Sequence, residues 1–340
     1  MRSAVLFLVF NRPESTRKVF DAIRAARPTK LYVAADGPRS SRPGEAKLCS
    51  EVREIAVSVD WPCEVKTLFR DGNLGCRAGV STGISWFFSH EEEGIILEDD
   101  VLPISTFFPF CDELLELYRN DPRISMISGS NLISNYFTPG HSYFFSRYTH
   151  IWGWASWRRA WQHYDVTMAQ WPRWRDGHSL EAISGGRSMF TRHWRSIFDA
   201  VYDGRVDTWD YQWTFAIWQM GGLTVLPAVN QTDNLGFGAD ATHTTDAAPQ
   251  YVVASRPALL KWPLAHPNVV KRNVQADQLI DTKVYGVTMV NLIRRHLRRF
   301  RAFAGSGFSK RAATRHAFAV REPEQHDAER QNTGAGDAKE

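Results

Sequence analysis

The chain has few cysteines, no long apolar run and no P-loop, and each absence narrows what it can be. Its four cysteines show no CxxC spacing, which is typical of reduced thiols in a cytosolic protein. No apolar run reaches the roughly 18 residues that a membrane-spanning helix needs. A GxxxxGK[ST] segment is absent, which excludes a P-loop enzyme. There are no internal repeats.

The residues that are present indicate a globular protein. Its 340 residues are 43% hydrophobic and 23% charged, enough for one large α/β domain or two modest ones. The net charge of +4 is unevenly spread, because residues 255–321 carry 14 Lys/Arg and two Asp/Glu whereas residues 322–340 carry two and six. We therefore expect a basic helical segment over 255–321 and a disordered tail over 322–340.

Short apolar segments alternate with segments of helical periodicity. Between the first two, Val19 and Ile23 share one helical face, and Pro13 marks a helix start. The apolar segments recur every 30 residues or so, at Ala4–Phe10, Lys30–Ala35, Cys63–Phe69, Gly94–Leu97 and Ile124–Ile127. The first lacks a small-residue cleavage site and is interpreted as a strand rather than a signal peptide. This alternation predicts an α/β fold with a mostly parallel sheet and helices on both faces.

The fourth of these segments ends in three consecutive carboxylates, Glu98, Asp99 and Asp100. A buried strand tolerates such a cluster only if something neutralises it, because isolated charges removed from water are costly. Oxygen ligands of this kind suit Mg²⁺ or Mn²⁺, and a cation at a strand tip usually serves an anionic ligand such as a diphosphate. The alternative is a solvated turn whose acids cap the next helix.

Polar residues follow the other predicted strands as well. Asn11 and Arg12 follow the first strand, Asp36-Gly37-Pro38-Arg39 the second, and Arg70-Asp71-Gly72-Asn73 the third. Because parallel strands end at the same edge of a sheet, we expect these side chains to converge on one rim with the acidic triplet. Such a rim suits an anionic ligand that is held through a metal ion.

The second half of the chain is rich in tryptophan. Eleven of the 13 tryptophans lie between Trp152 and Trp262. A dense aromatic core accounts for most of them, because Trp packs well in protein interiors. Aromatic faces also stack on sugar rings, and the excess favours a carbohydrate-binding half.

Several short motifs occur in a fixed order along roughly the first 245 residues. They are Asn11-Arg12-Pro13, Asp36-Gly37, Asn73-Leu74-Gly75, Glu98-Asp99-Asp100, Gly153-Trp154, Asp207-Thr208-Trp209-Asp210 and Asn234-Leu235-Gly236-Phe237-Gly238. This series resembles a nucleotide-sugar glycosyltransferase of the GT-A fold, closest to small bacterial proteins similar to the N-acetylglucosaminyltransferase that starts N-glycan branching. The resemblance implies a nucleotide-sugar-binding half over 1–130 and a Trp-rich acceptor half of the same domain over 131–254. Residues 246–340 have no match.

The resemblance implies roles at the donor side of the site. Asp100 would bind Mn²⁺ or Mg²⁺ directly, and Glu98 and Asp99 would contact the metal through water or contact the donor's ribose and sugar. Three further residues would contact the nucleotide: Arg12 near the base or diphosphate, Asp36 at the base, and Arg70 at the diphosphate.

It also implies the chemistry at the acceptor side. Asp210 would be the base that deprotonates the acceptor hydroxyl, with Asp207 as its rival because the spacing here departs from the family pattern. His243 would reach the metal or phosphates, or is an ordinary loop histidine. One in-line displacement would invert the anomeric centre. The expected reaction moves a sugar from a nucleotide-diphosphate sugar, expected to be a UDP-sugar, to a glycan or lipid-linked acceptor of a bacterial surface polysaccharide.

Two other classes stay open. A carbohydrate-binding protein built on a decayed transferase would keep the fold without turnover. A sugar nucleotidyltransferase should carry a glycine-rich loop with a lysine after the first strand, where this chain has Asn11-Arg12-Pro13-Glu14. We expect no nucleic-acid partner and a cytoplasmic location. The predicted basic amphipathic helix Tyr285–Phe303 either lies on the inner face of an anionic membrane or packs on the body of the protein.

Overall fold

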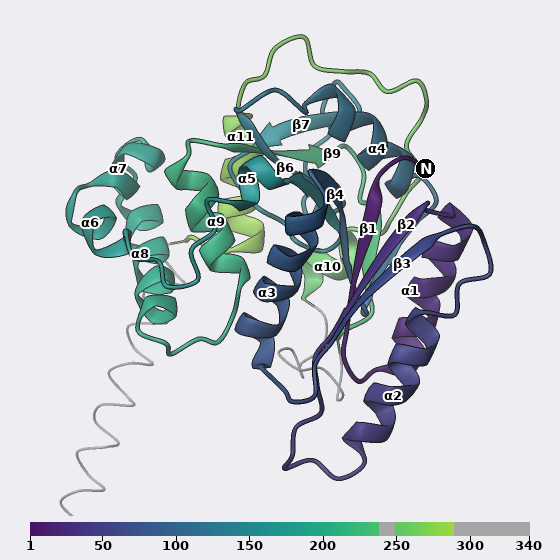
Figure 1. The fold of residues 1–340 in the computed structure, drawn as a ribbon. Helices are drawn as coiled ribbons and strands as arrows, with labels where there is room; N and C mark the ends of the chain where they lie inside the picture. The colour runs from purple at the N-terminus through teal and green to yellow at the C-terminus, as the bar shows by residue number, and fades with distance from the viewer. Residues whose placement is uncertain (238–248, 289–340) are drawn as a thin grey trace, which may run out of the picture. The chain divides into compact units, whose positions relative to one another are not determined.

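The computed structural model describes residues 1–237 and 249–288, all of which belong to one compact unit. An eight-stranded sheet in the order β3-β2-β1-β4-β8-β6-β9-β7 forms its centre, and β10 and β5 pair in a small second sheet (Figure 1). The strands are β1 (Ala4–Val9), β2 (Lys30–Ala35), β3 (Glu64–Phe69), β4 (Glu93–Glu98), β5 (Val101–Pro103), β6 (Ile124–Ser128), β7 (Tyr143–Ser146), β8 (Trp154–Trp157), β9 (Leu223–Pro227) and β10 (Thr232–Asn234).

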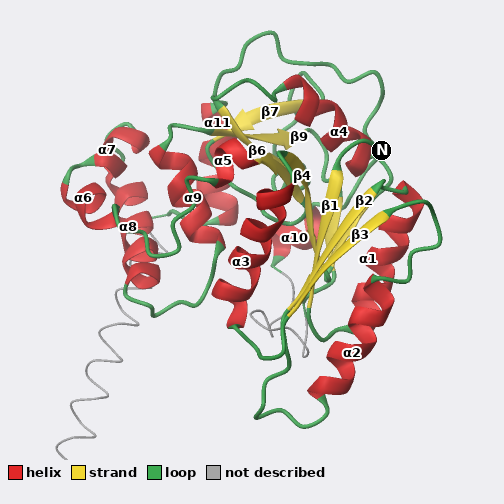
Figure 2. Ribbon diagram, in the orientation of Figure 1, coloured by secondary structure: helices red, strands yellow, loops and turns green. Residues whose placement is uncertain are grey.

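Helices lie on both sides of the sheet (Figure 2). They are α1 (Pro13–Ala26), α2 (Glu45–Ala56), α3 (Gly75–His90), α4 (Phe107–Leu117), α5 (Arg158–Trp161), α6 (Trp171–Asp176), α7 (Ser179–Ser184), α8 (Ser188–Tyr202), α9 (Asp210–Gln219), α10 (Gln250–Ala254), α11 (Val274–Leu279) and the π-helix η1 (Ile280–Val284). Within the described residues, no helix has the length and apolar character needed to cross a membrane.

The predicted α/β class is confirmed. All five predicted strands are present, with ends shifted by no more than one residue. β3, β2, β1 and β4 pair in parallel, as do β6 and β9. The strands β5, β7, β8, β9 and β10 were not predicted, and of these β8 pairs antiparallel with β4 on one side and β6 on the other. β8 has only four residues, all of them buried, so its sequence shows no alternation that would mark it as a strand.

Alternate residues of β1 enter two different cores. Val5 and Phe7 pack in a cluster with apolar residues of α1, α2 and α4. Leu6 and Leu8 pack on the other side, in a cluster with α3 and most of the Trp-rich segment. Because successive side chains of a strand point to opposite faces, a strand that is apolar at every position is covered on both sides.

The C-terminal part differs from its prediction. Residues 256–273 form no helix, and of the segment 255–321 the structure shows helix only over α11 and η1. Residues 285–288, where the basic amphipathic helix was predicted to begin, are not helical either. The remainder of that predicted helix and the predicted tail 322–340 lie outside the described residues.

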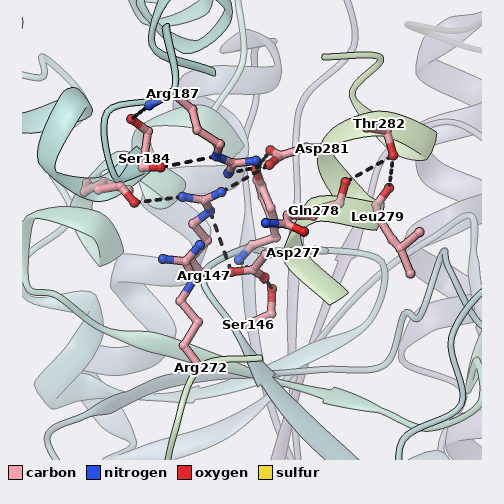
Figure 3. A network of polar contacts seen from close by, with 12 residues as sticks. Ser146, Arg147, Ser184, Arg187, Arg272, Asp277, Gln278, Leu279, Asp281 and Thr282 are labelled. Atoms are coloured by element: carbon pink, nitrogen blue, oxygen red, sulfur yellow. Dashed lines mark hydrogen bonds and ion pairs between the residues drawn. The ribbon is translucent and has the colours of Figure 1, made fainter. Parts of the chain in front are cut away.

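A buried polar network fastens α11 and η1 to the sheet (Figure 3). Arg147, which follows β7, lies 3.2 Å from Asp281 of η1 and 3.7 Å from Asp277 of α11, and all three side chains are at most 4% exposed. Arg187, at the start of α8, lies 2.8 Å from the same Asp281 oxygen, and the Ser146 hydroxyl donates to Asp277 at 2.6 Å. Removing one member of such a network leaves a buried charge unpaired, which is strongly destabilising.

Candidate functional site

The carboxyl ends of β1, β2 and β4 meet at one edge of the sheet and border a cavity of about 730 Å³. Two arginines line it, Arg12 after β1 and Arg39 after β2. Its acidic lining residues are Asp36, Glu98, Asp99, Asp100, Asp207 and Asp210. The rim expected from the parallel strands is therefore present, and it brings together most of the predicted site residues.

The acidic triplet occupies the turn between β4 and β5. Asp99 is 6% exposed, and its Oδ2 accepts the backbone N–H of Phe10 at 2.9 Å. Arg12 donates to Oδ2 of Asp100 at 2.6 Å, and its guanidinium lies 3.5 Å from Asp99. One arginine therefore faces two of the three carboxylates.

The negative charge around this turn is only partly neutralised. Burial, reinforced by Asp100 and Asp99, holds the pKa of Glu98 well above its usual value. Burial and then Asp100 also raise the pKa of Asp99, which Arg12 offsets only in part. Burial followed by the surrounding carboxylates, Glu98 first, raises the pKa of the Cys76 thiol to about 12. Such a site favours a cation.

The segment around Gly236 packs against Asp100 of the acidic triplet. Leu235 donates its N–H to the backbone oxygen of Asp100 at 2.7 Å, and Gly236 donates to the side chain of Asn234 at 2.7 Å. A Cβ on Gly236 would lie 2.2 Å from Oδ2 of Asp100. Only glycine allows the backbone to come this close to the carboxylate, which explains why a glycine follows Asn234-Leu235.

Asp36 lines the cavity, but its carboxylate also orders the neighbouring turn. Its two oxygens accept the backbone N–H groups of Gly37, Leu74 and Gly75 at 3.0 to 3.2 Å. A Cβ on Gly37 would lie 2.5 Å from backbone atoms of Gly72, so the turns after β2 and β3 are in close contact. The predicted contact with a nucleotide base would have to share these acceptor oxygens.

Arg70 does not point into the cavity, contrary to its predicted place at the rim. Its guanidinium donates to the hydroxyl of Thr82 on the exposed side of α3, at 2.5 Å, and the cavity lining does not include it. Arg39 lines the cavity instead. It is paired with the buried Glu45 and lies over the ring of Phe10, 5.4 Å from its centroid.

The two candidate bases have different environments. Asp210 begins α9, lines the cavity and accepts a hydrogen bond from the Thr208 hydroxyl. Asp207 also lines the cavity, but its side chain is 63% exposed and lies 3.4 Å from Arg77. The structure thus gives Asp210 the more enclosed position. His243 lies outside the described residues.

Core packing accounts for most of the tryptophans, as predicted from the sequence. Eight of the tryptophans between residues 154 and 218 are buried, namely Trp154, Trp157, Trp161, Trp171, Trp194, Trp209, Trp213 and Trp218, and Trp174 is half-buried. Many pack ring against ring, as Trp154 does on Trp209 with centroids 5.8 Å apart. The partly exposed aromatic residues of the cavity are Phe10, Trp152, Tyr211, Phe237, Tyr251 and Tyr285.

Five polar residues of the cavity were not predicted: Thr149, His150, Tyr211, Tyr251 and Tyr285. His150 is 5% exposed, its Nδ1 lies 3.4 Å from the backbone oxygen of Ser130, and its Nε2 has no hydrogen-bond partner among the described residues. Burial lowers its pKa to about 4, so the ring is neutral near pH 7. No motif or periodicity marks these residues, since tertiary packing brings them to the cavity.

The carboxylates of the cavity suit a metal ion that is held partly by the protein and partly by a substrate. Among residues 1–237 and 249–288, no three His, Cys, Asp or Glu side chains are grouped as a ready-made metal centre. Mg²⁺ and Mn²⁺ sites that serve phosphates commonly use one or two carboxylates together with phosphate oxygens and water. The partly neutralised carboxylates of the β4–β5 turn, among them Asp100, fit that kind of site.

No protein-family model and no curated protein matches the chain. Among solved structures, it is similar to an active-site mutant of LgtC, with 10% identity, 82% of this chain and 94% of that chain covered, and a TM-score of 0.35. It is similar to mouse xyloside xylosyltransferase 1 (11% identity, 65% and 82% covered, TM-score 0.30). It is also similar to CMP:2-keto-3-deoxy-manno-octonic acid synthetase complexed with CTP (16%, 53% and 84%, 0.31).

Proposed function

We propose that the chain is a metal-dependent glycosyltransferase that moves a sugar from a nucleotide-diphosphate sugar, a UDP-sugar, to a glycan or lipid-linked acceptor. The observation that carries this proposal is the meeting of the acidic triplet, Arg12 and Asp210 in one cavity. The order of motifs that resembles GT-A glycosyltransferases supports it, because the matched segments around Asp36, Asp100 and Gly236 lie together at that cavity.

Each residue has a task in this proposal. Asp100 holds Mn²⁺ or Mg²⁺, which when bound absorbs the negative charge of the leaving diphosphate. Glu98 and Asp99 orient the donor's ribose and sugar, and Arg12 contacts the diphosphate. Asp210 accepts the proton of the acceptor hydroxyl on the side opposite the leaving group, so that transfer inverts the anomeric centre.

The acceptor enters beside Asp210. Tyr211, Tyr251 and Tyr285 line the same cavity as Asp210, and burial, followed by the neighbouring Tyr211 and Asp210, raises the pKa of Tyr285. Half-buried tyrosines offer both a ring face and a hydroxyl, which suits a sugar ring better than a purely apolar surface. A glycan acceptor, free or lipid-linked, is consistent with that chemistry.

Calorimetric titration of UDP with Mn²⁺ present, and again after chelation, tests the donor site. We expect binding only with the metal, and a loss of roughly 100-fold in the variant Asp100→Ala, since even residues that only support a metal ligand cost 10- to 100-fold. Asp203→Ala is the matched control, because Asp203 pairs with Arg205 on the surface. Equal UDP affinity with and without chelator would refute the metal-dependent donor site.

Turnover separates the proposed enzyme from its two rivals. A transferase releases UDP from a UDP-sugar when an acceptor is present. A nucleotidyltransferase would instead release pyrophosphate from a nucleoside triphosphate and a sugar 1-phosphate. A binding protein would bind sugars without catalysing either reaction. That outcome would be compatible with the fold and would refute the proposed transferase activity.

A further inference from the structure

Arg12 lines the cavity beside the acidic triplet. It precedes α1, and its backbone oxygen accepts both the N–H of Thr16 at 3.0 Å and the Thr16 hydroxyl at 2.7 Å. Its backbone position is therefore fixed by the start of the helix. Its side chain, 22% exposed, extends to Asp100 at 2.6 Å and Asp99 at 3.5 Å.

The charges around the cavity make this contact important. Arg12 and Arg39 are the Lys/Arg side chains among the described residues of the lining, and Glu45 already engages Arg39. Arg12 is thus the cation that faces the triplet. Oδ2 of Asp100, the atom that it contacts, is also enclosed by Gly236.

We propose that Arg12 is an internal counter-cation that exchanges with the divalent metal. It holds Asp100 while the site lacks a donor, and it releases Asp100 and moves to the diphosphate when metal and nucleotide bind together. This inference rests on the proposed function. Its physical basis is that a guanidinium and a divalent cation at the same carboxylate repel each other, and Arg12 already occupies Oδ2 of Asp100, so binding of the metal favours departure of the guanidinium.

The exchange couples the two ligands. Metal alone must break the Arg12–Asp100 pair and leaves the guanidinium without that partner. A nucleoside diphosphate gives the guanidinium a new anionic partner, so each ligand strengthens binding of the other by the same factor. The metal therefore binds weakly in the absence of nucleotide, and its affinity rises when the nucleotide is bound.

Mn²⁺ titrations followed by electron paramagnetic resonance, without and with UDP, test the exchange through binding alone. In Arg12→Gln we expect Mn²⁺ alone to bind roughly tenfold more tightly, because its competitor is gone, and UDP with saturating Mn²⁺ to bind roughly tenfold more weakly, the range of one charge-assisted hydrogen bond. The opposite signs distinguish exchange from simple loss of a ligand contact. Arg17→Gln is the control, since Arg17 is 61% exposed on α1 and pairs with Glu51 at 3.8 Å.

Arg12→Lys provides a second variant that keeps the charge. A lysine competes with the metal as a single ammonium, so Mn²⁺ alone should bind with an affinity between those of the wild type and Arg12→Gln. Unchanged or weaker Mn²⁺ binding in a folded Arg12→Gln, while the wild type binds UDP with Mn²⁺, would overturn the exchange and leave the proposed function intact. A wild-type chain that binds no UDP with Mn²⁺ would overturn both.

Discussion

The close contact between Gly236 and Asp100 allows a test of the donor site that changes no charge. In the variant Gly236→Ala the new Cβ would lie 2.2 Å from Oδ2 and 3.0 Å from Cγ of Asp100. Ordinary van der Waals contact begins at about 3.4 Å, so the carboxylate or the loop has to withdraw by about 1 Å. Binding sites tolerate displacements of only about 0.5 Å, and a misplacement of 1 Å can cost up to about 100-fold.

We therefore expect Mn²⁺-dependent UDP affinity to fall by roughly 10- to 100-fold in Gly236→Ala while the protein stays folded. Local overpacking costs about 1 to 3 kcal/mol, here near the lower end because a side chain can move aside. Replacing glycine by alanine restricts the unfolded chain and offsets about 0.4 to 1 kcal/mol of that cost. The melting temperature should then change by only a few degrees, whereas calorimetry should show the loss of UDP binding.

Gly140→Ala is the matched control for this experiment. The same substitution there meets no atom within 4 Å, and Gly140 has no left-handed backbone conformation that alanine would strain. It should leave both UDP affinity and melting temperature near the wild-type values. A Gly236→Ala chain that binds UDP and Mn²⁺ as tightly as the wild type would refute the placement of Asp100 at the donor site.

Two further variants test the other polar groups of the cavity. Asp210→Asn should keep donor affinity within a few fold and lower kcat by roughly 10²- to 10⁴-fold, whereas Asp207→Asn should change kcat much less; near-normal transfer by a folded Asp210→Asn would exclude it as the base. His150 has a folded-state pKa of about 4, below the value of 6.5 that it has in an unfolded chain, so the stability that it contributes is present above pH 6.5 and is lost as the pH falls toward 4. Between pH 7 and pH 5 the wild type should therefore lose about 2 kcal/mol more unfolding free energy than His150→Asn, measured by urea denaturation, and parallel losses would contradict a buried neutral His150.

The parallel part of the sheet was predictable because its strands follow simple physical rules. β1, β2 and β4 are short apolar runs covered on both faces, and their polar ends must share one edge of the sheet. That rule correctly brought Arg12 and Asp100 to one cavity from positions 88 residues apart. It could not predict β8, because an antiparallel strand can enter a sheet from any distance along the chain.

Side-chain direction was the weaker part of the prediction. Arg70 follows β3 just as Arg12 follows β1, yet it turns toward Thr82 and away from the cavity. Asp36 reaches the cavity, but its oxygens bind the backbone of the turn before α3. Both outcomes depend on where α3 lies, and the sequence near strands β2 and β3 does not encode that position.

The charges that line the cavity explain why the proposed metal ion and diphosphate would bind together. Six acidic residues and two arginines line it, and Glu45 already neutralises one of those arginines. A nucleoside diphosphate could not enter such a cavity alone, because its own negative charge would add to that of the carboxylates. A cation without a diphosphate would displace Arg12 from Asp100 and gain little. The pair of ligands together would balance both charges, which is the reason that the proposed transfer needs the metal and the diphosphate at the same time.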